Sequence, residues 1–129
     1  MPRQLPPRCI LIHDHPQAQA ALAVATELGV AVKLRSAEGA VGYLGPAYFR
    51  GLDVVLDCGE APGHALAALR AGVKRIRLRA TPETLARIAD IARQLGSELD
   101  QTEAPTLDLA SVPMGRWSAA CHAWLTSAP

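Results

Sequence analysis

Reactive side chains directly follow three strand-like runs of this chain, two continuously apolar and one in which apolar residues alternate with arginines. The run at 9–12 leads into His13, the run at 54–56 leads into Asp57, and the run at 74–78 leads into Arg79. If these runs are neighbouring parallel strands, their ends meet at one edge of the sheet, where ligands of open α/β sheets bind. The sequence therefore predicts a ligand site that contains His13, Asp14, His15, Asp57, Glu60, Arg79 and Thr81.

Asp14 and Asp57 are the candidate metal ligands. Two carboxylates at the ends of adjacent strands repel each other unless both are solvated or share a cation. Mg²⁺ prefers oxygen ligands of this kind and retains several waters. The pair therefore suggests a magnesium site; the alternative is that Asp14 caps the following helix and Asp57 is solvated.

His13 and His15 lie on the same side of an extended segment, because side chains alternate along it. Together with Asp57 or Glu60 they form a set that suits a transition metal. The alternative is that both histidines are simply exposed in a loop.

Arg75, Arg77 and Arg79 alternate along one predicted strand. They form either a row that binds anions or the solvated charges of an edge strand. Arg79 is the best candidate for a small anionic ligand, because Thr81 starts a helix whose free amides also favour an anion.

Cys58 is either a nucleophile near a base or a buried structural cysteine; the second interpretation is favoured, because adjacent carboxylates raise a thiol pKa.

Composition restricts the class of protein. The 129 residues are 50% hydrophobic with a formal net charge of +1, which gives no general attraction to nucleic acid or to an anionic membrane. The uncharged stretch 16–26 is too short and too rich in Ala and Gln to span a bilayer. Three widely spaced cysteines argue against a disulfide framework and favour a reducing compartment. We therefore expect a cytoplasmic protein.

Strand and helix patterns alternate along the chain. Strands are expected at 9–13, 30–34, 53–57, 74–79 and 107–112, and helices after Pro16, near 36–44, at 63–71, after Thr81 and at 114–125. This alternation predicts one α/β domain over 1–129, with a loose leader at 1–8 and a helical tail at 113–129. The expected fold is a three-layer, doubly wound, flavodoxin-like domain with a mostly parallel sheet of four to five strands.

Trp117 and Trp124 are seven residues apart, on one face of the predicted tail helix. They cover the domain's own core or form a contact with a homodimer mate or another protein, since tryptophan is enriched at such interfaces.

Four segments resemble response-regulator receiver domains. The run from Cys9 to Pro16 is similar to the family's first strand and acidic turn, and 52–57 is similar to the strand with the phosphoacceptor aspartate. Segments 68–73 and 78–85 are similar to the last helix-strand-helix passage. The resemblance implies a receiver-like fold in which Asp57 accepts a phosphoryl group, Asp14 helps to hold magnesium, and Arg79 or Thr81 senses the phosphate.

Two departures from the receiver pattern change the expected activity. His13 replaces one of the two acidic residues of the first turn, and Arg79 stands where the family carries lysine. The resemblance is therefore to a degenerate, pseudo-receiver-like module. We expect a non-enzymatic regulatory or ligand-binding domain; the alternatives are a small enzyme that acts on a phosphorylated or carboxylated metabolite and an assembly protein without a small-molecule site.

Overall fold

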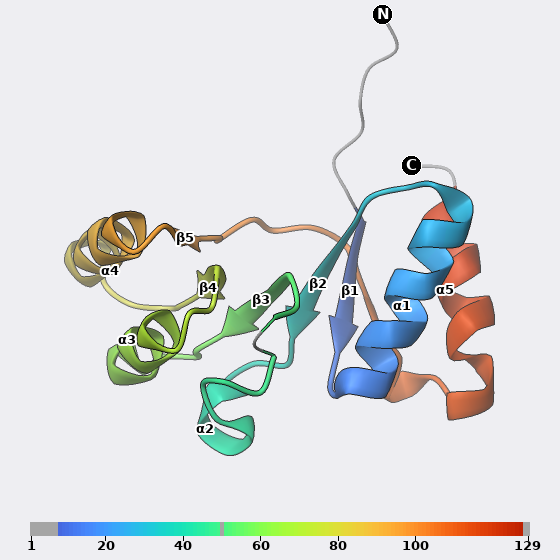
Figure 1. Cartoon of the computed structure of the whole chain (residues 1–129), viewed down its shortest axis with the longest axis horizontal. Helices are drawn as coiled ribbons and strands as arrows, with labels where there is room; N and C mark the ends of the chain where they lie inside the picture. Colours follow the sequence, from blue (N-terminus) through green and yellow to red (C-terminus); the bar gives the residue numbers. More distant parts are fainter. Residues whose placement is uncertain (1–7, 50, 128–129) are drawn as a thin grey trace, which may run out of the picture. The chain divides into compact units, whose positions relative to one another are not determined.

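A computed structural model of the chain describes residues 8–49 and 51–127 and divides them into two compact units (Figure 1). The first unit comprises the described residues up to Leu34 and from Ala104 onward, and the second comprises the described residues from Arg35 to Glu103. Each unit is described in turn.

The first unit pairs β1 with β6 in parallel, with Cys9 opposite Thr106 and Leu11 opposite Asp108. Helices α1 and α5 lie side by side (Figure 1). The elements of this unit are β1 (Arg8–Ile12), α1 (His15–Leu28), β6 (Thr106–Asp108), the 3-10 turns η1 (Leu109–Ser111) and η2 (Met114–Arg116), and α5 (Trp117–Thr126).

Helix α1 begins and ends at residues whose chemistry fixes its length. The Asp14 carboxylate accepts the Gln17 N–H at 2.9 Å, and Gly29 ends the helix with φ at 67°, a conformation that glycine adopts without strain. Ala18, Ala21 and other small residues are buried on its inner face. Their small size allows α5 to pack closely against α1.

The second unit contains three parallel strands in the order β3, β4, β5, with Leu56 opposite Ile76 and Ile76 opposite Leu99. Helix α3 contacts both α2 and α4. Leu56, Ile76 and Leu78 are fully buried and form the centre of the core. The elements are α2 (Val41–Leu44), β3 (Val54–Asp57), α3 (Pro62–Arg70), β4 (Arg75–Arg77), α4 (Pro82–Gln94) and β5 (Glu98–Leu99).

The remaining strand, β2 (Val32–Ser36), contributes residues 32–34 to the first unit and residues 35–36 to the second. The hydrogen-bonded strand order of the sheet is β5-β4-β3-β2-β1-β6. The predicted α/β class with a parallel sheet is confirmed, but the sheet has six strands rather than four to five. The additional strand is β5, which has only two residues and lies in a polar segment that carries no strand pattern.

Several predicted boundaries differ from the observed ones. The strand expected at 107–112 ends at Asp108, because the Asp108 carboxylate accepts the Ala110 N–H at 2.9 Å and starts the turn η1. Arg8, assigned to the leader, is the first residue of β1, while residues 1–7 of the leader lie outside the described residues. The predicted strand at 74–79 is shortened to Arg75–Arg77.

Candidate functional site

The Asp57 carboxylate organises the carboxyl end of β3. Its Oδ1 accepts the Gly59 N–H at 2.7 Å and the Gly39 N–H at 3.2 Å. Its Oδ2 lies 3.9 Å from Nε of Arg77, and the residue is only 6% exposed. A buried carboxylate is costly unless it is paired and hydrogen-bonded, and here all three contacts meet that requirement. Asp57 therefore holds two loops together instead of being solvated.

Two glycine-containing loops meet at Asp57. Gly39 and Gly59 both have positive φ values, 69° and 62°, and a Cβ atom on Gly59 would lie 3.4 Å from the Cα of Gly39. Ser36, at the end of β2, is buried, and its hydroxyl oxygen accepts the Asp57 N–H at 2.8 Å. The connections after β2 and β3 therefore lie in direct contact with each other at Gly39 and Gly59.

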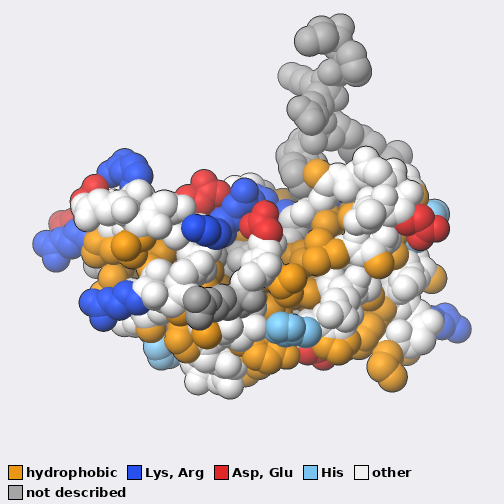
Figure 2. Space-filling view, viewed as in Figure 1, with side chains coloured by type: hydrophobic (Ala, Val, Ile, Leu, Met, Phe, Trp, Pro, Cys, Tyr) orange, Lys and Arg blue, Asp and Glu red, His pale blue; other side chains and the backbone are white. Residues whose placement is uncertain are grey.

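The alternating arginines of β4 are each paired with two carboxylates. Arg75 Nε lies 3.0 Å from Glu98 and 3.6 Å from Asp53, and the Arg77 guanidinium pairs with Glu103 in addition to Asp57. Figure 2 shows blue and red side chains interleaved rather than separated into areas of one charge. Arg75 and Arg77 are therefore paired with carboxylates rather than simply solvated, and anion binding by the arginine row stays a prediction.

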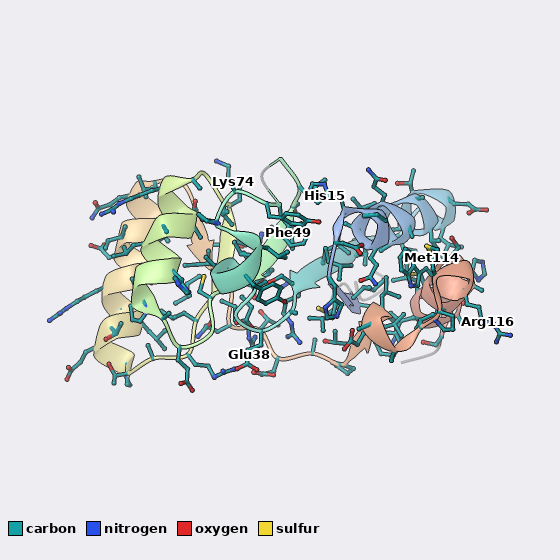
Figure 3. All side chains as sticks on the ribbon, turned by 90° about the horizontal axis from the view of Figure 1, so that it is seen from below. His15, Glu38, Phe49, Lys74, Met114 and Arg116 are labelled. Atoms are coloured by element: carbon teal, nitrogen blue, oxygen red, sulfur yellow. The ribbon has the colours of Figure 1, made fainter. Side chains whose placement is uncertain are left out.

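Arg79 differs from Arg77 in how firmly its partners hold it. It pairs with Glu38, labelled in Figure 3, and its Nε lies 3.8 Å from Glu60. The Arg79 side chain is 49% exposed and those of Glu38 and Glu60 are 62% and 79% exposed, whereas the Arg77 side chain is only 15% exposed. Exposed ion pairs contribute little to stability, so the partners of Arg79 can be exchanged for a ligand at low cost.

The backbone fixes the position of Arg79 even though its side chain is exposed. Its N–H donates to the Gly59 carbonyl at 2.8 Å. Thr81, two residues later, caps α4 by accepting the Thr84 N–H at 3.3 Å. Glu60, Arg79 and Thr81 therefore all lie in the connections after β3 and β4, as the sequence predicted.

The sequence-predicted residues of the first unit have other partners. His13 Nε2 lies 2.8 Å from Oδ1 of Asp108, and its backbone N–H donates to the Gln17 side chain at 2.8 Å. This pair joins the carboxyl ends of β1 and β6. Asp14 caps α1, which was one of the two alternatives for it, and His15 is the first residue of that helix.

No three His, Cys, Asp or Glu side chains among residues 8–49 and 51–127 are grouped so as to hold a metal ion. Asp14 belongs to the first unit and Asp57 to the second. The magnesium site suggested by these two residues, and the transition-metal site suggested by the histidines, stay predictions.

Cys58 has the properties of a structural cysteine. It is buried, and burial together with the neighbouring Asp57 carboxylate raises its pKa to about 12. The thiolate, which is the nucleophile, is therefore disfavoured at neutral pH. Cys9 and Cys121 are likewise buried free thiols.

Both tryptophans of the tail use their indole N–H groups within the first unit. Trp117 donates to the Val112 carbonyl at 2.9 Å, and Trp124 donates to the Cys9 carbonyl at 3.1 Å. The Arg8 guanidinium lies 5.2 Å from the Trp124 ring centroid. The contacts of Trp124 join α5 to β1, and that of Trp117 joins α5 to the segment between η1 and η2. Both agree with the interpretation that the tryptophans cover their own core; a partner contact stays a prediction.

Sequence reasoning missed several partners of the predicted site residues, in both units. Glu38 and Gly39 lie in a region without a clear pattern, and Glu103 and Asp108 lie far along the chain from their partners. The one available signal was Gly39 itself, since an isolated glycine after a strand indicates a turn.

The chain matches no protein-family model and no curated protein. In the described part of the chain, no helix is both long enough and apolar enough to cross a membrane.

Proposed function

We propose that this chain is a non-enzymatic, ligand-binding domain of regulatory type whose ligand binds at Arg79. The observation that carries the proposal is the exposed ion pairing of Arg79 with Glu38 and Glu60 at the carboxyl ends of the strands. Ligands of open α/β sheets bind at this edge. The Arg79 backbone N–H donates to the Gly59 carbonyl, so the point from which the side chain extends is fixed before a ligand arrives.

Exchange of partners at Arg79 costs little free energy. Exposed ion pairs contribute about 0–1 kcal/mol each, so a ligand that displaces Glu38 forfeits only a small amount of stability. Arg77 is different, because its side chain is mostly buried beside Asp57. We expect Arg77 to keep this ion pair, and so to stabilise the loops, whether or not a ligand is bound.

The charge balance of the edge indicates the chemistry of the ligand. Two cations, Arg77 and Arg79, are surrounded by four carboxylates, those of Glu38, Asp57, Glu60 and Glu103. A simple anion would be repelled by this excess of negative charge. A ligand with both an anionic and a cationic group fits better, because its anion binds Arg79 and its cation neutralises the displaced carboxylates.

The absence of an activated nucleophile in the described part of this edge supports a binding role rather than a catalytic one. Asp57 is occupied by two amides and an arginine, and Cys58 is buried with a raised pKa. The receiver-like interpretation agrees with a regulatory domain of this kind, and it too stays a proposal.

Three probes with three carbon atoms test this function: β-alanine, propionate and propylamine. In an NMR titration, β-alanine should shift the backbone amide signals more than propionate or propylamine does, with the largest changes at Gly39, Gly59 and Arg79. Arg79→Gln should abolish the response, whereas Arg87→Gln, which removes an exposed arginine from α4, should not. The proposal is wrong if the three probes act equally or if Arg79→Gln binds β-alanine as the native chain does.

A further inference from the structure

A cleft of about 620 Å³ lies at the amino ends of β3 and β4. It is formed by the segments that lead into these two strands, whereas Arg79 follows the carboxyl end of β4. Its volume is within the range of small-molecule sites, about 300–1,000 Å³. The lining residues are Phe49, Gly51, Leu52, Asp53, Gly72, Val73, Lys74 and Arg75.

The cleft has an apolar wall. Phe49 and Val73 are 2% and 6% exposed, and Leu52 is half-buried. The Phe49 ring packs edge-on against Tyr48, with a centroid separation of 4.8 Å, which fixes its orientation. Leu52 is the side chain of this wall with surface left to cover, so a ligand can contact it without rearranging the core.

Glycines keep the rim of the cleft open. Gly51 and Gly72 have φ values of 89° and 91°, which other residues rarely adopt, and no atom lies within 4 Å of a Cβ built on either. The two turns therefore present backbone without side chains at the entrance.

One cation of the cleft lacks a described counter-ion. Arg75 is compensated by Glu98 and by Asp53, which itself lines the cleft. Lys74 is exposed, and no carboxylate of residues 8–49 or 51–127 pairs with it. Figure 3 labels Lys74 and Phe49, on the segments that lead into β4 and β3. An ammonium group beside an apolar wall is the complement of an amphiphilic acid.

We infer that this cleft binds a small organic acid, with the acid group on Lys74 and the apolar body against Leu52, beside the nearly buried Phe49 and Val73. Neither group suffices alone: the ammonium selects the charge, and the apolar surface that the ligand newly removes from water supplies the affinity. The site is separate from that at Arg79, and a carboxylate with a short alkyl chain is the simplest ligand for it.

Hexanoate and 1-hexanol are matched probes, because they share the chain length and differ in charge. In an NMR titration to about 10 mM, which reports Kd values in the millimolar range, hexanoate should shift the amides of Gly51, Leu52, Val73 and Lys74. The same concentration of 1-hexanol should act much more weakly. Lys74→Gln should weaken hexanoate binding about five- to tenfold, as expected for a charged contact at a partly exposed site.

Two further variants keep the test decisive. Arg87→Gln removes a positive charge from α4 and should leave hexanoate binding unchanged, while Leu52→Asp places a carboxylate in the cleft and should abolish it. Thermal unfolding followed by circular dichroism verifies that each variant is folded. The inference is overturned if hexanoate causes no shift in these amides, if 1-hexanol acts equally well, or if Lys74→Gln binds hexanoate as the native chain does.

Discussion

The Gly39 N–H donates to Oδ1 of Asp57 at 3.2 Å, so a residue at the end of β3 holds the loop that follows β2. The same oxygen accepts the Gly59 N–H at 2.7 Å. One carboxylate therefore fixes two connections at the edge where Arg79 is presented, and the site depends on Asp57 even where the ligand would not touch it.

Replacing Asp57 by alanine should lower the free energy of unfolding by about 2–4 kcal/mol, because two buried amides and Arg77 lose their acceptor. Asp57→Asn should cost less, since its side-chain oxygen still accepts both amides. Asp53→Ala is the matched control; its exposed ion pair with Arg75 is worth about 0–1 kcal/mol. Urea unfolding measures all three, and equal losses for Asp57→Ala and Asp53→Ala would contradict the role of Asp57.

Gly59→Ala should destabilise the chain by about 1–2 kcal/mol, because an L-residue is strained at φ 62° and its Cβ would lie 3.4 Å from Gly39. Gly63→Ala provides the contrast. Gly63 is in α3 without a positive φ and with open space around it, so alanine should stabilise by about 0.5–1 kcal/mol. Thermal unfolding distinguishes them, and the same sign for both would refute the argument.

Cys58 should make stability decrease at alkaline pH. The pKa of Cys58 is raised from 9.0 to about 12 in the folded chain. Between these two values the unfolded chain loses the thiol proton and the folded chain keeps it. The stabilisation from the neutral thiol is therefore complete below pH 9 and is lost as the pH rises from 9 towards 12. Cys58→Ala should reduce this dependence in urea unfolding between about pH 8 and about pH 11, a range that includes the ordinary pKa of a thiol. An unchanged slope would show that Cys58 does not cause it.

His13 and Asp108 should be energetically coupled. Their side chains are 31% and 46% exposed, so a double-mutant cycle with His13→Ala and Asp108→Ala should give an interaction energy of about 0.5–1 kcal/mol. Asp108 also accepts the Ala110 N–H, so its single variant should cost more than that of His13. Additive effects of the two variants would mean that the contact contributes nothing.

Asp57 should be a poor phosphoryl acceptor despite the receiver-like pattern around it. Its Oδ1 is occupied by two amides, and the side chain is only 9% exposed. Intact-mass measurement after incubation with acetyl phosphate and Mg²⁺ should therefore show no added phosphoryl group. A mass increase that Asp57→Asn abolishes would instead establish the acceptor role.

The sequence by itself determined the α/β class, the buried strand 54–57 and the capped start of α4, because these depend on local patterns of apolar residues, proline and capping hydroxyls. It also placed Glu60, Arg79 and Thr81 after strands β3 and β4. Neighbouring residues in the sequence are enough to specify each of these features.

Only the tertiary structure decided which charges meet. Glu38 is 41 positions from Arg79 and Asp108 is 95 positions from His13, and no local pattern encodes such a pairing. The short strand β5 likewise forms through its register with β4, without an apolar run of its own. The physical reason is that ion pairs and edge strands depend on positions fixed by the packing of distant segments, whereas helices, caps and buried strands are encoded in their own residues.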